Sequence, residues 1–276
     1  MSGYETLRVR ADRGVAWLTI DHPPINLFDA QLMGDLMRAG AALEADPDVR
    51  VVVVDSANPD FFIAHADVKL IQLLPAEAPP KPTELGFFHA MVDRFRTMPK
   101  ATIGMVEGIA RGGGSELLLS LDMRFGALGR AILAQPEVAL GIIPGGSGTQ
   151  RLPRLVGRAR ALEVILGCND FPADLAERYG WLNRALPPAE LRPFVERLAH
   201  QIASFPAEAI ALAKEAVAAA ERPTLEGLLE EADCFNRAVA TPAARARMAR
   251  FLEVGGQTEE MERDPQGLAA RILDKA

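Results

Sequence analysis

The stretch Gly112-Gly113-Gly114-Ser115-Glu116, followed by Leu117-Leu118-Leu119, decides how this chain is interpreted. Three consecutive glycines allow backbone angles and a close approach to a ligand that side chains would forbid. The glutamate and leucines that follow favour a helix, whose first N–H groups lack intrahelical partners and lie at the positive end of its dipole. Such a turn can stabilise a developing negative charge, as an oxyanion hole does. A strand-to-helix turn with glycines chosen for packing alone is the alternative.

The composition excludes several classes of protein. The 276 residues are 49% apolar and 24% charged, which is ordinary for a soluble globular protein with a sizeable core. The net charge of −7 argues against nucleic acid or an anionic membrane as the main partner. Cys168 and Cys234 show no metal spacing and are interpreted as reduced thiols. Without a signal-peptide pattern or a long apolar run, the sequence predicts a soluble cytoplasmic protein.

The first half of the chain alternates strands and helices. Residues 15–20 read as a strand, and helical spacing follows from a plausible N-cap at Asp29 to Pro47. Residues 51–54 form an uninterrupted β-branched run, which is typical of a strand buried on both faces. We expect a helix over 83–98 and another buried strand over 101–106, which leads into the glycine stretch. This order predicts parallel crossover topology in an α/β fold.

The second half carries another glycine-rich loop and then becomes helical. Gln135-Pro136-Glu137 precedes the loop, which runs from Leu140 to Arg151. From Arg158 onward the pattern is mostly helical, and near residue 205 the composition shifts to helices rich in alanine and glutamate. We place a subdomain boundary there.

These pieces together resemble the enoyl-CoA hydratase/isomerase (crotonase) superfamily, in family order over roughly residues 12–225. The resemblance implies a crotonase-like spiral of repeated ββα units with a C-terminal helical subdomain. We assign residues 1–205 to the spiral core with the active site and 206–276 to the helical subdomain, which would cover the site and form oligomer contacts. The matching pieces are Asn26, Ala64-His65-Ala66-Asp67, Gly108 through Glu116, Asp122, Gln135-Pro136-Glu137 and Gly141 through Arg151.

The resemblance also implies the roles of individual residues. The backbone N–H groups of Ala66 and Gly113 would polarise a thioester carbonyl and stabilise enolate charge. Glu116 and Glu137 would flank the substrate double bond and handle the water and the α-proton. The N–H of Gly145 would contact the attacking water. Structural alternatives are an exposed helix position for Glu116 and a charge at a helix N-terminus for Glu137.

The segment around the first oxyanion residue departs from the family pattern. Ala64, His65 and Asp67 are expected to contribute to substrate or water binding, but His65 replaces the usual glycine. Its imidazole either points to solvent or lines the thioester channel, and positive φ would strain it. His22 stands where many members carry an arginine, and Arg111 where a small or apolar residue is frequent.

The resemblance implies an acyl-CoA thioester as substrate, with coenzyme A as part of the substrate, no separate cofactor and no metal. A homotrimer or dimer of trimers is expected, because alanine-rich faces near 206–220 and 235–250 would leave apolar surface exposed on a monomer. Enoyl-CoA isomerase, or another crotonase-type lyase or decarboxylase, is the first alternative to a hydratase. A second is a thioester hydrolase with Ser115 as nucleophile and a histidine base, or a catalytically silent binding paralogue.

Overall fold

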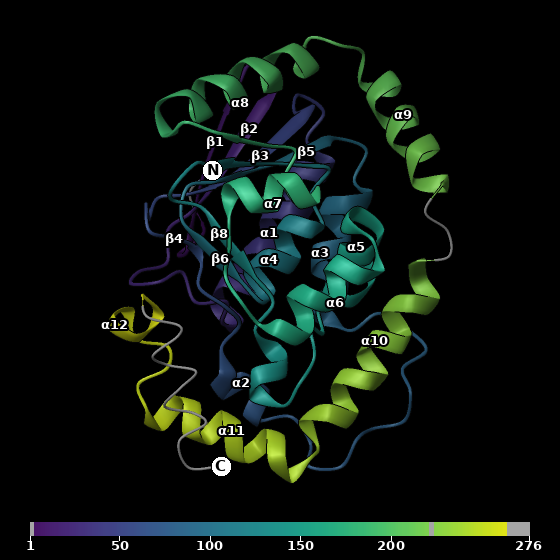
Figure 1. The fold of residues 1–276 in the computed structure, drawn as a ribbon. Helices are drawn as coiled ribbons and strands as arrows, with labels where there is room; N and C mark the ends of the chain where they lie inside the picture. The colour runs from purple at the N-terminus through teal and green to yellow at the C-terminus, as the bar shows by residue number, and fades with distance from the viewer. Residues whose placement is uncertain (1–2, 221–223, 264–276) are drawn as a thin grey trace.

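A twisted sheet of mainly parallel strands forms the first layer of the molecule (Figure 1). The computed structural model describes residues 3–220 and 224–263. Within them, the larger sheet has the order β1-β2-β3-β5-β7-β10, in which only the β1–β2 hairpin is antiparallel. Its strands are β1 Leu7–Asp12, β2 Val15–Ile20, β3 Val51–Ser56, β5 Ala101–Val106, β7 Met123–Ala127 and β10 Arg184–Leu186.

A smaller sheet runs beside it in the order β4-β6-β8-β9. Each large-sheet strand β3, β5 and β7 is followed by a small-sheet strand and then by a helical segment, so the chain winds through repeated ββα turns. This spiral confirms the α/β crotonase-like architecture expected from the resemblance. The small-sheet strands are β4 Phe61–Ile63, β6 Ile109–Arg111, β8 Ile132–Ala134 and β9 Phe171–Pro172.

Helices fill the turns of the spiral and then wrap around it. The expected N-cap is confirmed, because the Asp29 carboxylate accepts a hydrogen bond from the Leu32 N–H. The helices of the core are α1 Ala30–Ala45, α2 Val68–Gln72, α3 Phe87–Thr97, α4 Gly113–Leu119, the 3₁₀ turn η1 Glu137–Leu140, α5 Gly148–Val156, α6 Arg158–Gly167 and α7 Ala173–Tyr179. After them come α8 Pro188–Ala203, α9 Ala207–Ala219, α10 Thr224–Val239, α11 Pro242–Glu253 and α12 Glu259–Glu262.

Helix α3 is shorter than the sequence pattern predicts. We expected it over 83–98, but it begins at Phe87, because Gly86 adopts an extended backbone and takes the N-cap position. Glycine is a poor helix former, so the helix does not extend to the residues that precede Gly86. The proline-rich residues before it form no helix or strand.

The core is buried on both faces of the larger sheet. Val52 and Val54 of β3 point into the main cluster between the sheets, whereas Val51 and Val53 point to the opposite face. There α8 covers the sheet with Leu191, among other residues. Burial on both faces explains why β3 reads as an unbroken β-branched run.

The last helices surround the spiral. Figure 1 shows α8 above the larger sheet, while α9, α10 and α11 continue around the core to α12. The predicted subdomain boundary at residue 205 falls between α8 and α9. It stays a prediction, and part of 206–276 lies outside the described residues. Among the helices of the described part, none has the length and apolar character needed to cross a membrane.

Candidate active site

The two predicted oxyanion residues lie against each other. An atom at the Cβ position of Gly113 would be 3.5 Å from the Ala66 Cβ. Phe28 pairs with the backbone on either side of Ala66: its N–H donates to the His65 oxygen at 2.9 Å, and its oxygen accepts from the Asp67 N–H at 3.1 Å. In this parallel bridge the Ala66 N–H points away from Phe28. Within residues 3–220 and 224–263, neither the Ala66 nor the Gly113 N–H donates to a protein acceptor.

Glu116 lies inside the protein, one turn into α4, and only 4% of its surface is exposed. Its Oε1 accepts hydrogen bonds from the Gly146 N–H at 2.7 Å and from the Gly148 N–H at 2.8 Å. Burial, and then the charge of Glu231, raises the pKa of Glu116 to about 8. The carboxylate is therefore oriented by the second glycine loop and is able to exchange a proton near neutral pH.

Glu137 approaches the same region from η1. It is 9% exposed, and its Oε1 lies 2.9 Å from the position that a Cβ on Gly112 would take. The Gln135 amide satisfies its hydrogen bonds when its nitrogen faces the carboxylate of Glu137. In this orientation it donates to both Glu137 oxygens at 3.1 Å. Burial, followed by the charge of Glu116, raises the pKa of Glu137 well above its ordinary value. Both structural alternatives, an exposed Glu116 and a merely terminal Glu137, disagree with this burial.

Aromatic rings pack directly against the glycines of the second loop. A Cβ on Gly145 would lie 2.4 Å from the Phe235 ring, and one on Gly146 would lie 2.2 Å from the Phe88 ring and 2.5 Å from Glu116 Oε2. Glycine is therefore required at both positions by contact with neighbouring side chains. The predicted water contact of Gly145 stays a prediction.

The other two residues expected to bind substrate or water have structural partners. Ala64 is fully buried in a small apolar cluster with Ile25. Asp67 is the N-cap of α2 and accepts from the Lys69 N–H at 2.9 Å and from Gln257 Nε2 at 2.7 Å. Their contribution to substrate binding remains a prediction.

His65 does not point to solvent, and its predicted contribution to substrate binding stays a prediction. Its Nε2 lies 2.9 Å from Oε1 of Glu262 in α12, its Nδ1 lies 2.8 Å from the Ala66 oxygen, and its ring contacts Phe251 edge-on. The expectation that it points to solvent is wrong, because the C-terminal segment covers it. His65 is also not among the residues with positive φ, so it carries no left-handed strain.

Arg111, the other unexpected residue beside the glycines, belongs to the same contact with the C-terminal segment. Its guanidinium donates to both carboxylate oxygens of Asp170 at 2.8 Å and to the backbone oxygen of Glu262 at 3.0 Å. The departures from the family pattern at His65 and Arg111 therefore have a common explanation: together they anchor α12.

The arrangement does not favour Ser115 as a nucleophile. Its side chain is buried in α4, and each of the four histidines has another partner. His65 and His89 contact glutamates, His22 contacts Asp29 at 2.8 Å, and His200 lies near Arg13. A serine hydrolase needs a base within hydrogen-bond reach of the hydroxyl.

Sequence reasoning missed a third buried glutamate at the site. Glu231, in α10, contacts His89 and the loop that orients Glu116. Nothing in the sequence distinguishes it from its exposed neighbour Glu230. The hydrogen bonds from the Gln135 amide to Glu137 were also missed, although Gln135 lies inside the motifs that carry the resemblance.

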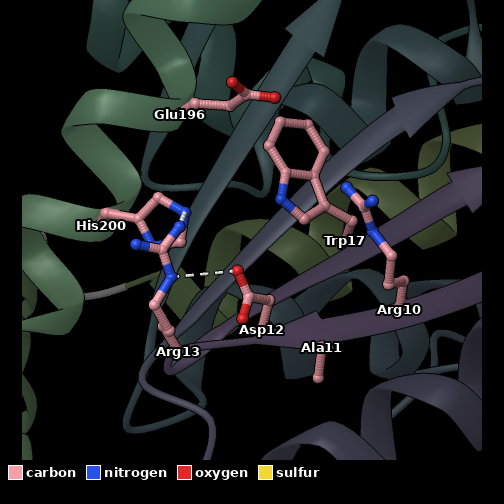
Figure 2. A pocket seen from close by; sticks show the side chains of 7 residues that line it. All are labelled: Arg10, Ala11, Asp12, Arg13, Trp17, Glu196 and His200. Atoms are coloured by element: carbon pink, nitrogen blue, oxygen red, sulfur yellow. Dashed lines mark hydrogen bonds and ion pairs between the residues drawn. The ribbon is translucent and has the colours of Figure 1, made fainter.

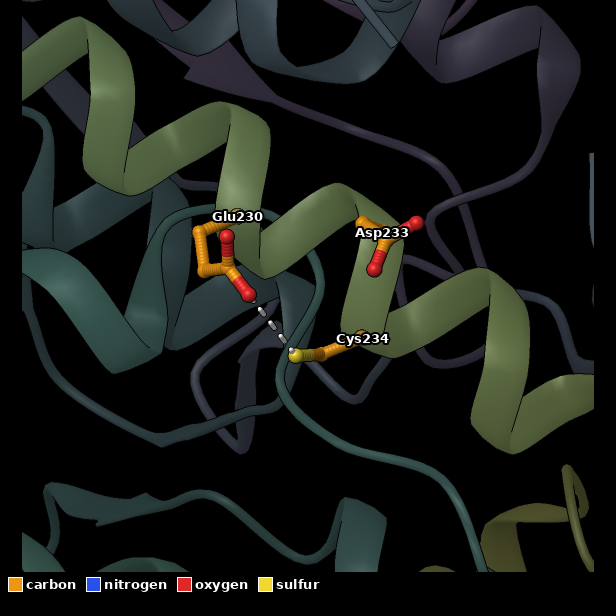
Figure 3. Close-up of side chains that lie close together, drawn as sticks. All are labelled: Glu230, Asp233 and Cys234. Atoms are coloured by element: carbon orange, nitrogen blue, oxygen red, sulfur yellow. Dashed lines mark hydrogen bonds between the residues drawn. The ribbon is translucent and has the colours of Figure 1, made fainter. Parts of the chain in front are cut away.

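Two other features lie apart from these glutamates. A surface pocket of about 380 Å³ lies between β1, β2 and α8. Figure 2 shows its lining side chains, among which Asp12 and Arg13 pair with each other. Figure 3 shows Glu230, Asp233 and Cys234 on α10, whose possible ligand atoms lie within 4.8 Å of one another. Lys81 already pairs with Glu230.

Comparisons with known proteins define the family of the chain. The family described as enoyl-CoA hydratase/isomerase matches residues 10–258, and the chain belongs to this family. "Probable enoyl-CoA hydratase echA8" of Mycobacterium tuberculosis is 35% identical over 253 residues, which cover 91% of this chain and 96% of that protein. The crotonyl-CoA hydratase of Syntrophomonas wolfei is 34% identical with the same coverage. A crystal structure named as a putative enoyl-CoA hydratase from Streptomyces avermitilis has a TM-score of 0.88 at 41% identity, covering 98% of this chain and 99% of that one.

Proposed function

We propose that the protein is an enoyl-CoA hydratase that adds water across the C=C bond of a 2-enoyl-CoA thioester. The observation that carries this proposal is the placement of Glu116 and Glu137, both buried, around a turn where the N–H groups of Ala66 and Gly113 have no acceptor among residues 3–220 and 224–263. Family membership and relatives with hydratase names support the same reaction.

The proposed reaction uses each of these groups once. Glu116 takes a proton from water while the water oxygen bonds to the β-carbon. The π electrons move toward the thioester oxygen, where the N–H groups of Ala66 and Gly113 stabilise the enolate. The enolate then takes a proton from Glu137 at the α-carbon. Transfer of the proton from Glu116 to Glu137 restores the starting state.

The surroundings of the two carboxylates support this division of roles. Glu116 Oε1 accepts two N–H bonds, which partly offset the rise in its pKa caused by burial and by Glu231 and leave Oε2 to receive a proton. Glu137 has its pKa raised by burial and by the charge of Glu116, which favours its protonated form. An isomerase needs only one such group to move an α-proton, so the retention of both favours hydration.

The function is tested by incubating the enzyme with 2-enoyl-CoA thioesters of short, medium, long, branched and aromatic acyl groups. The proposal expects 3-hydroxyacyl-CoA from at least one of them. Glu137→Gln should reduce that rate by roughly 10²–10⁴-fold, as expected for general acid catalysis. Migration of the double bond without hydration would instead indicate an isomerase, and release of free coenzyme A a hydrolase.

We extend the proposal to cofactor, location and assembly. Coenzyme A enters as part of the substrate, and the reaction needs no other cofactor or metal. The unpaired thiols of Cys168 and Cys234 suit a cytoplasmic protein. A homotrimer or dimer of trimers is supported by α9, which has no buried residue and exposes 63% of Leu212 and 69% of Val217. Sedimentation of the protein as a compact monomer would reject the proposed oligomer but not the proposed reaction.

A further inference from the structure

Glu231 makes more hydrogen bonds at the site than either predicted glutamate. It is 2% exposed, although it comes from α10, more than eighty residues after the loop that it contacts. Its Oε1 accepts from the Ser147 N–H at 2.5 Å and lies 3.0 Å from His89 Nε2. Its Oε2 accepts from the Thr149 N–H at 2.7 Å and from the Thr149 hydroxyl.

These contacts alternate with those of Glu116 along one loop. The N–H groups of Gly146 and Gly148 donate to Glu116, whereas those of Ser147 and Thr149 donate to Glu231. Four successive backbone donors are thus divided between two carboxylates that approach the loop from different elements. Neither carboxylate can move without loosening the loop that holds the other.

The loop has a conformation that requires such support. Ser147 has a φ of 101°, in the left-handed region that residues other than glycine rarely occupy. Strained positions of this kind persist where surrounding contacts fix them, and they concentrate at active sites. Here the fixing contacts at Ser147 and Thr149 come from Glu231.

We infer that Glu231 is a positioning residue of the active site, which holds residues 146–149 from α10 so that this loop holds Glu116. This inference rests on the proposed function, because it assigns Glu116 the task of activating water. It also gives the C-terminal helices a direct role in the site of their own chain.

The charges around Glu116 give the inference a measurable consequence. Within the described part of the chain, Glu137 on η1 and Glu231 on α10 are the acidic groups that face Glu116, and Arg151 on α5 is the basic one. His89 on α3 faces Glu231. The negative charge of Glu231 raises the pKa of Glu116, so removal of that charge lowers it.

The test compares Glu231→Gln with Glu230→Gln, its exposed neighbour on the same helix. In Glu231→Gln we expect kcat to fall on the order of 10²-fold, as for a misplaced catalytic group, with little change in KM. The rise of activity with pH, which follows the ionisation of Glu116 at about pH 8 in the wild type, should move to lower pH. Glu230→Gln should behave as wild type in all three respects.

A second readout does not depend on turnover. The pKa of Glu116, followed by carbon NMR of the side-chain carboxyl in the resting enzyme, should be lower in Glu231→Gln than in Glu230→Gln. A uniform loss of kcat with an unmoved pH profile and an unmoved Glu116 pKa would overturn the inference and leave Glu231 a purely structural residue. If the wild type itself hydrates no enoyl-CoA, the proposed function fails, whereas a hydrating Glu231→Gln enzyme with wild-type kcat refutes only the positioning role.

Discussion

Replacement of Glu116 by glutamine should strongly reduce activity and yet stabilise the protein. An amide oxygen at the position of Oε1 can still accept from the Gly146 and Gly148 N–H groups. The substitution therefore removes the ionisation and keeps both bonds. Burial, and then the charge of Glu231, raises the pKa of Glu116 from 4.5 to about 8. Such a rise corresponds to about 5 kcal/mol of folding free energy that is lost once the carboxyl is ionised in both states.

The gain in stability should appear only as the pH rises. Below 4.5 the carboxyl of Glu116 is protonated in the folded and the unfolded chain, so it does not affect their difference. Between 4.5 and about 8 the unfolded chain ionises first, and the folded state loses stability with increasing pH. Glutamine does not titrate, so Glu116→Gln should match the wild type in acid and exceed it by up to about 5 kcal/mol in base.

Urea unfolding at about pH 5 and about pH 9, at one protein concentration, measures this difference. We expect the midpoint of Glu116→Gln to exceed that of the wild type by an amount that grows with pH, with m unchanged. Hydration should fall roughly 10²–10⁴-fold in the same variant. Glu230→Gln, whose side chain is exposed, should show no gain with pH. A stability difference that is independent of pH, or a less stable Glu116→Gln at high pH, would refute the reasoning.

Three further substitutions test other parts of the structure. Gly146→Ala places a Cβ 2.2 Å from the Phe88 ring, so hydration should fall sharply, whereas Gly86→Ala, with open space around it, should leave the rate unchanged. Glu262→Gln removes a pairing that lowers the pKa of Glu262 and raises that of His65 against the opposing effect of burial. The wild type should be more stable to unfolding than Glu262→Gln by about 3 kcal/mol near neutral pH. This difference in stability should be lost as the pH falls through the Glu262 pKa or rises through the His65 pKa, and urea unfolding midpoints would measure it. Asn26→Ala removes bonds to Ser56 and to two backbone oxygens, and thermal unfolding should show a loss of about 1–3 kcal/mol.

The sequence predicted the elements whose signal is local. The unbroken valines of β3 indicated a strand buried on both faces, and Asp29 indicated the start of α1. The glycines before Glu116 indicated a tight turn at a helix N-terminus, and this turn is present at Gly113. In these cases the residue types of a few neighbouring positions determine the conformation.

Contacts between distant parts of the chain could not be predicted in the same way. His65 and Glu262 are separated by 197 positions, and Glu231 lies 84 positions after Ser147. Nothing in the local sequence of α10 or α12 indicates that one glutamate is buried and the next exposed. Only the path of the C-terminal helices around the core brings these groups to the site (Figure 1).

The central claim is that this chain adds water to the β-carbon of an enoyl thioester, and hydration in ¹⁸O-labelled water tests it most directly. Mass spectrometry of the products from a single turnover of an accepted 2-enoyl-CoA should find one ¹⁸O atom in the β-hydroxyl group and an intact thioester. Glu116→Gln and Glu137→Gln should each slow the appearance of that label. Label in a free carboxylate together with free coenzyme A, or a shifted double bond without label, would contradict the account.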